Sequence, residues 1–126
     1  MFWDTTAFVD HFRQLPVAVQ HFSGVRSGLE PAYCSVITEA ELWAGIRSKE
    51  EELQVAATLF LLTVLPVNST IARLAGSFLR SAGTNKPHFG DALIAASASQ
   101  QGQTILTADA ASQRMFGHHV NYLVYR

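Results

Sequence analysis

The segment 88–98 constrains the fold more than any other part of the sequence. It places one carboxylate, Asp91, at the head of a stretch that is almost wholly small and apolar. A helix with apolar residues on several faces is buried on most sides. We therefore expect this helix to anchor Asp91 in the middle of the protein. A carboxylate in such a place is costly unless a charged or hydrogen-bonding group meets it.

Composition limits the possible classes of protein. The 126 residues, 48% of them hydrophobic, fit one compact domain over 1–126. We expect a cytoplasmic protein without a membrane segment, because no apolar run reaches about 18 residues and the first residues carry no signal sequence. The single cysteine, Cys34, agrees with a reducing compartment. The net charge of −1 gives no indication of a nucleic-acid partner.

Strand and helix patterns alternate along the chain. Strands are predicted over 2–3, 32–37, 64–67, 103–107 and 122–125. Helices are predicted over 4–12, 17–25, 38–46, 50–63, 69–81, 88–98 and 108–115, and a loop over 82–87. Strands separated by helices imply an α/β fold, with a central, mostly parallel sheet between two helical layers.

Several acids are predicted to meet at one edge of this sheet. Asp4 and Asp109 each follow a predicted strand, and ligands of open parallel sheets bind at the carboxyl ends of the strands. Glu41 lies four residues beyond strand 32–37, one turn into the next helix, so it can point to the same crevice. No strand directly precedes Asp91, and its place beside the other acids is an assumption.

Each acid also has a purely structural interpretation. Asp4, Asp91 and Asp109 stand where an N-cap or first-turn Asp is common. Glu41 follows Thr38 by three residues, which is the spacing of a capping box. The functional interpretation depends on the combination of the acids.

Carboxylates that share a crevice repel one another unless a cation compensates, and the sequence offers no local run of Lys or Arg. A hard divalent cation, Mg²⁺ or Mn²⁺, prefers oxygen ligands and activates water for attack on a phosphodiester. The hydroxyls of Thr6 and Thr107 lie two residues from Asp4 and Asp109 and are candidates to orient ligands or waters. Helix capping or strand propensity explains them equally well.

Four segments together resemble the successive motifs of the PIN-domain nucleases, particularly the VapC-like toxins of toxin-antitoxin pairs. They are Asp4-Thr5-Thr6, the stretch 35–46 around Glu41, the stretch 89–96 around Asp91, and 105–109 ending at Asp109. The resemblance covers nearly the whole chain. Two departures are Phe2-Trp3 in place of an aliphatic lead-in and Ala108 where a basic or polar residue is frequent.

The resemblance implies an α/β/α fold and a Mg²⁺- or Mn²⁺-dependent endoribonuclease. Asp4, Glu41, Asp91 and Asp109 then form the acidic, metal-binding quartet. It also implies a homodimer, and a cognate VapB-like antitoxin whose tail occupies a groove beside the active site. Lys86 and His88 are candidates to contact the RNA substrate, although a solvated loop is the simpler explanation.

Two other functions remain open. One is a non-catalytic RNA- or partner-binding module that keeps the fold. The other is a housekeeping nuclease that processes RNA or cleaves DNA. The RNA target depends on loop surfaces that no motif encodes.

Overall fold

The computed structural model describes residues 1–83 and 88–126. The strands are β1 (Phe2–Trp3), β2 (Tyr33–Ser35), β3 (Thr63–Leu65), β4 (Ile105–Thr107) and β5 (Tyr122–Val124). The helices are α1 (Thr5–Phe12), α2 (Pro16–Arg26), α3 (Val36–Ala44), α4 (Lys49–Leu59), α5 (Ser69–Ala82), α6 (Phe89–Gln101) and α7 (Ala110–Phe116). No helix of these described residues is long and apolar enough to cross a bilayer.

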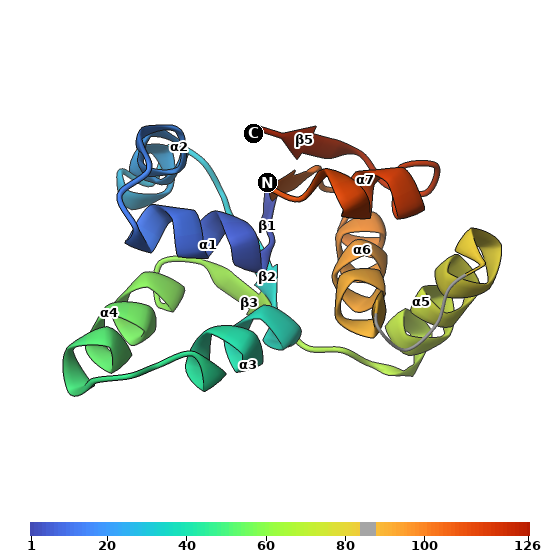
Figure 1. The fold of residues 1–126 in the computed structure, drawn as a ribbon, viewed down its shortest axis with the longest axis horizontal. Helices are drawn as coiled ribbons and strands as arrows, with labels where there is room; N and C mark the ends of the chain where they lie inside the picture. Colours follow the sequence, from blue (N-terminus) through green and yellow to red (C-terminus); the bar gives the residue numbers. More distant parts are fainter. Residues whose placement is uncertain (84–87) are drawn as a thin grey trace.

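The strands form one sheet in the order β3-β2-β1-β4-β5, and every pairing in it is parallel. The predicted three-layer α/β/α architecture is therefore confirmed. Figure 1 shows α1, α2 and α4 on one side of the sheet and α5, α6 and α7 on the other. β1 lies at the centre of the sheet, with β4 beside it, so the residues that follow these two strands are close together.

Successive side chains of the central strands enter opposite layers. Phe2 and Ile105 belong to the core beneath α5, α6 and α7. Trp3 and Leu106 belong to the core beneath α1, α2 and α4. Both faces of β1 and β4 are buried, which explains why these two strands do not alternate between apolar and polar residues.

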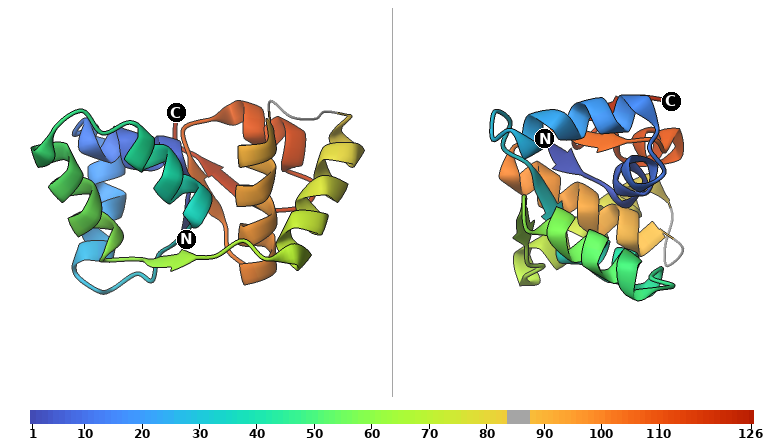
Figure 2. Two further views of the ribbon diagram at one scale, coloured as in Figure 1. Left: turned by 90° about the horizontal axis from the view of Figure 1, so that it is seen from below. Right: turned by 90° about the vertical axis from the view of Figure 1, so that its left-hand side faces the viewer.

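The helix α6 has the predicted character, because most of its small residues are buried. Its first turn, however, reaches the protein surface: the side chain of Asp91 is 37% exposed. Asp91 therefore stands at the rim of the core rather than in its middle. Nearby α3 lies between α1 and α6 (Figure 2, left), with Leu42 packed in one core and Ile37 against the other.

Three predicted boundaries are wrong. The strand predicted over 32–37 ends at Ser35, because the Ser35 hydroxyl accepts the backbone N–H of Ile37 at 3.0 Å and caps α3. The β-branched pair after Ser35 is therefore helical, and Thr38 is not the cap. The helix predicted over 50–63 ends at Leu59, and the next strand is Thr63–Leu65 rather than 64–67. The predicted loop 82–87 lies mostly outside the described residues, and Gly83, with φ of +68°, ends α5.

Candidate active site

Asp4 and Asp109 stand at the carboxyl ends of two adjacent parallel strands. Asp4 directly follows β1 and is the N-cap of α1. Asp109 follows β4 by two residues and is the N-cap of α7. The expected capping roles are therefore real, and they bring both carboxylates to the edge of the sheet where ligands bind in this architecture.

The Asp4 carboxylate is buried and is held on both oxygens. Its Oδ1 accepts the backbone N–H of Thr6 at 2.5 Å and the hydroxyl of the same residue at 2.8 Å. Its Oδ2 accepts the Thr107 hydroxyl at 2.5 Å. Burial raises the pKa of Asp4 above its usual range, and these hydrogen bonds oppose that rise. Oδ2 keeps one further acceptor position, which a cation or water can use.

The two threonine hydroxyls connect the start of α1 to the turn after β4. The Thr6 hydroxyl accepts the backbone N–H of Ala108, and the Thr107 hydroxyl accepts that of Asp109, each at 2.9 Å. Each hydroxyl has a single hydrogen, and each uses it for Asp4. The network fixes both the rotamer of Asp4 and the start of the Asp109 turn.

Asp109 uses one carboxylate oxygen for its cap and leaves the other nearly free. Oδ1 accepts the backbone N–H of Ala111 at 2.9 Å. Oδ2 has only a long contact of 3.4 Å with the Ser112 hydroxyl. A capping Asp can therefore also offer an oxygen to a ligand.

Glu41 lies in the second turn of α3, because that helix begins at Val36. The capping-box explanation of Glu41 is therefore wrong. Its Oε1 instead accepts the Thr5 hydroxyl at 2.7 Å, and the same hydroxyl lies 3.1 Å from Thr38 Oγ1. Sequence analysis did not identify Thr5 as a partner of Glu41, although Thr5 stands between Asp4 and Thr6 in the first motif.

The charges of all three other acids act on the pKa of Asp91. Burial raises the pKa of its carboxyl above the usual range, and nearby negative charges raise it further, in the order Asp109, Asp4 and Glu41. His88 acts in the opposite direction, with Nδ1 at 3.9 Å from Oδ2 of Asp91. The start of α6 lies beside Glu41, because a Cβ added at the neighbouring Gly90 would stand 3.9 Å from Glu41 Oε2. The place of Asp91 beside the other acids stays a prediction.

Comparison with known proteins decides the family. The family model of the PIN domain matches residues 1–115. The chain belongs to the PIN domain family. The resemblance stated from the four motifs is thereby confirmed. A search of curated protein sequences found no match.

Solved structures share this PIN fold at low sequence identity. DNA-bound VapBC from Salmonella typhimurium matches with a TM-score of 0.79 and 19% identity, over 99% of this chain and 97% of that one. A toxin-antitoxin complex from Klebsiella pneumoniae gives 0.75 and 19%, over 89% and 88%. FitAcB from Neisseria gonorrhoeae gives 0.73 and 22%, over 97% and 95%.

The acids of this PIN domain suit a hydrated hard cation better than a closed cage of protein ligands. In the described part of the chain, no three His, Cys, Asp or Glu side chains are arranged to ligate one ion directly. Mg²⁺ is usually held by only one or two carboxylates and keeps several waters. The remaining acceptor position on Asp4 Oδ2 and the weakly engaged Oδ2 of Asp109 fit that mode of binding.

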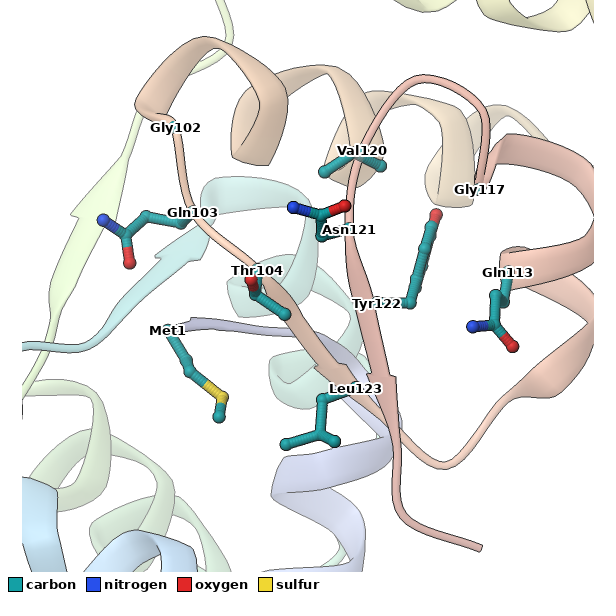
Figure 3. A pocket seen from close by; sticks show the side chains of 10 residues that line it. All are labelled: Met1, Gly102, Gln103, Thr104, Gln113, Gly117, Val120, Asn121, Tyr122 and Leu123. Carbon is teal, nitrogen blue, oxygen red and sulfur yellow. The ribbon is translucent and has the colours of Figure 1, made fainter.

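Tyr122 on β5 is a residue near the acids that sequence analysis missed. Burial raises its pKa, and the charges of Asp91, Asp4 and Asp109 raise it further, so its hydroxyl stays protonated. Tyr122 also lines a hollow of about 690 Å³ at the opposite, amino ends of the strands (Figure 3). A lone tyrosine in an apolar strand carries no signal that would reveal this position.

The two loop residues predicted to contact substrate have different outcomes. His88 directly precedes α6 and lies beside Asp91. Lys86 lies outside the described residues.

Proposed function

We propose that this PIN domain is a Mg²⁺- or Mn²⁺-dependent endoribonuclease that acts as the toxin of a toxin-antitoxin pair. The observation that carries the proposal is the meeting of Asp4 and Asp109 at the carboxyl ends of β1 and β4, joined through the Thr6 and Thr107 hydroxyls. The charges of Asp109, Asp4 and Glu41 also raise the pKa of Asp91. Carboxylates from four separate motifs that gather at one site repel one another, and this repulsion costs free energy. Of the described side chains whose charges act on Asp91, His88 is the one whose effect lowers the pKa. A divalent cation removes this cost.

Membership of the PIN family supports the reaction class, because PIN domains are nucleases. In the proposed site, a bound Mg²⁺ or Mn²⁺ would supply activation of water and stabilisation of charge on the phosphate. Asp4 is suited to hold the ion, because three hydrogen bonds fix its carboxylate and one acceptor position on Oδ2 remains.

The other acids have complementary parts in this proposal. Asp109 offers its weakly engaged Oδ2, and Asp91 offers a carboxylate from the first turn of α6. Glu41, whose Oε1 accepts the Thr5 hydroxyl, would hold water bound to the ion. Thr6 and Thr107 position Asp4 and the Asp109 turn without binding the ion themselves.

A groove beside the site supports the proposed antitoxin partner. It has a volume of about 460 Å³, lies between α1, α3 and α4, and includes Glu41 together with apolar Phe12, Ile46 and Val55. A peptide segment with an apolar face fits such a surface and would restrict access to Glu41. The Klebsiella neighbour is itself described as a toxin-antitoxin complex. The homodimer implied by the family resemblance stays a prediction.

Cleavage of RNA by the purified protein tests the reaction. We expect discrete cleavage with Mg²⁺ or Mn²⁺, none with EDTA, and a loss of rate of about a hundred-fold or more in Asp91→Asn. Glu50→Gln, which neutralises an exposed acid on α4, is the matched control and should cleave as wild type. Metal-independent cleavage, or equal rates in wild type and Asp91→Asn, would contradict the proposal.

Expression in cells separates a toxin from the other two functions. A toxin arrests growth, and co-expression of a small antitoxin-like reading frame from immediately upstream relieves the arrest. Cleavage without arrest would favour housekeeping RNA processing or DNA cleavage. A cellular effect that Asp91→Asn leaves intact would favour a non-catalytic binding module.

A further inference from the structure

A small hollow of about 370 Å³ lies next to the carboxylate site and has Asp109 in its lining. Thr6, Ala108 and Asp109 form the end that it shares with the site. Its other end is lined by Asp10, Arg13 and Arg126, which none of the four family motifs includes. The hollow therefore joins the acids to two arginines that are more than a hundred residues apart in the sequence.

Arg126 is held in place by a buried acid. The side chain of Asp10 is only 4% exposed, and its Oδ1 accepts a hydrogen bond from Nη2 of Arg126. Its Oδ2 accepts the Tyr125 hydroxyl at 2.6 Å, so both oxygens are occupied. The guanidinium has five N–H donors, and Asp10 uses only one nitrogen. The half-exposed Arg126 thus presents further donors at a fixed place.

Arg13 adds a second guanidinium to this end of the hollow. The ion pair with Arg126 neutralises Asp10, whereas Arg13 makes no ion pair within the described part of the chain. Its side chain is exposed, just beyond the end of α1. The larger hollow in Figure 3 differs in chemistry, because its lining contains amides, a hydroxyl and a phenol but no charged side chain.

We propose that Arg13 and Arg126 form a subsite for a backbone phosphate of the RNA, next to the phosphate that is cleaved. This inference rests on the proposed function and specifies how the substrate is held. Arginine binds phosphate through several directed N–H donors. A strand whose scissile phosphate lies at Asp109 continues naturally into the adjoining hollow, where the two arginines face its next negative charge. Such contacts position the strand without reading its bases.

Binding of a short single-stranded oligoribonucleotide tests this subsite. All proteins carry Asp91→Asn, which prevents turnover under the proposed function. The variants are Arg13→Gln and the double variant Asp10→Asn with Arg126→Gln, which leaves no buried charge without a partner. Arg73→Gln on α5, remote from the hollow, is the matched control. Thermal melting shows that each protein is folded.

We expect the affinity of each variant to fall about three- to ten-fold at low salt, and Arg73→Gln to bind as the parent does. The slope of log affinity against log salt should decrease by about 0.7 for each phosphate of the single strand that an arginine no longer neutralises. A neutral methylphosphonate placed at single linkages beside the cleavage site should weaken binding by the parent at one linkage. That linkage should weaken binding by Arg13→Gln less than it weakens binding by the parent, because only Arg126 still faces the phosphate.

Unchanged affinity and slope in folded variants would overturn the subsite, as would an equal loss of affinity in Arg73→Gln. Unchanged RNA binding would instead favour an acidic peptide as the ligand of the hollow. Failure of the proposed function has a separate signature, which is the absence of RNA cleavage by protein that retains Asp91. The binding comparison needs no turnover, so it tests the subsite even if the protein cleaves no RNA. A parent protein that binds no RNA would overturn the proposed subsite.

Discussion

Replacement of Thr107 by valine tests how the Asp4 carboxylate is stabilised. The Thr107 side chain is fully buried, so water has no access to replace its hydroxyl. Valine has nearly the same shape but neither donates to Asp4 Oδ2 nor accepts the backbone N–H of Asp109. The substitution therefore removes one hydrogen bond to a charged group and leaves one amide without its partner.

The magnitude follows from these two losses. A hydrogen bond to a charged group contributes about 1.5–3 kcal/mol, and a buried amide without a partner costs about 1–3 kcal/mol. The added buried methyl group offsets about 0.8 kcal/mol of this. We expect the free energy of unfolding to fall by about 2–5 kcal/mol, which for a domain of this size lowers Tm by roughly 10–20 °C.

The pH dependence identifies the carboxylate as the cause. Burial already raises the pKa of Asp4 in the folded protein, so its ionisation costs stability as pH rises above the unfolded value of 3.8. Without the Thr107 hydroxyl this pKa rises further, because a hydrogen bond that favours the charged form is gone. The destabilisation by Thr107→Val should therefore be larger at pH 7.5 than at pH 4.5.

Thermal and urea denaturation at the two pH values provide the assay. Thr63→Val is the matched control, because Thr63 is exposed on the edge strand β3 and its hydroxyl makes no hydrogen bond among the described residues. It should change stability by less than about 0.5 kcal/mol. A Thr107→Val protein that melts like Thr63→Val, or that loses the same stability at both pH values, would refute this explanation.

Three further predictions concern other parts of the molecule. Asp91→Asn should stabilise the protein at pH 7.5 by up to about 1 kcal/mol, after allowance for solvent screening of this half-exposed group, because the raised pKa of Asp91 means that its ionisation costs stability. The gain should vanish near pH 4, and a variant no more stable at pH 7.5 would count against the coupling. Cys34 is fully buried with a pKa raised to about 12, so iodoacetamide at pH 8 should modify it only in urea; rapid labelling of the folded protein would be incompatible with this burial. Gly117→Ala should cost about 1–3 kcal/mol in urea denaturation, because the new Cβ would stand 2.5 Å from the Gln113 carbonyl oxygen, and a neutral result would exclude that clash.

The three layers and the parallel sheet could be predicted from the sequence because strand and helix patterns alternate along the chain. Such an alternation is compatible with few folds. Asp4 and Asp109 were placed at the sheet edge correctly for the same reason, since Asp4 directly follows β1 and Asp109 follows β4 by two residues. The start of α3 was misplaced because β-branched Val36 and Ile37 favour a strand, whereas one hydroxyl, that of Ser35, caps the helix earlier. The strand propensity of Val36 and Ile37 is therefore outweighed by the capping hydrogen bond to Ser35.

The rest of the site depends on contacts between distant segments. No local pattern pairs Thr5 with Glu41, or places Tyr122 near Asp91. The approach of Asp91 to the other acids depends on how α6 packs beneath the sheet, which periodicity does not specify. Arg126 reaches the site only because Asp10, on the first helix, holds it there.

Binding of Mn²⁺ tests most directly whether the acids form a divalent-metal site. The spectrum of free Mn²⁺ in electron paramagnetic resonance is followed as the ion is titrated into wild type, Asp91→Asn, Asp109→Asn and Glu50→Gln. We predict at least one bound ion per chain in wild type and in Glu50→Gln, and binding weakened about ten-fold or more in the two site variants. Wild-type protein that binds no Mn²⁺, or equal binding by all four proteins, would contradict a metal site at these acids.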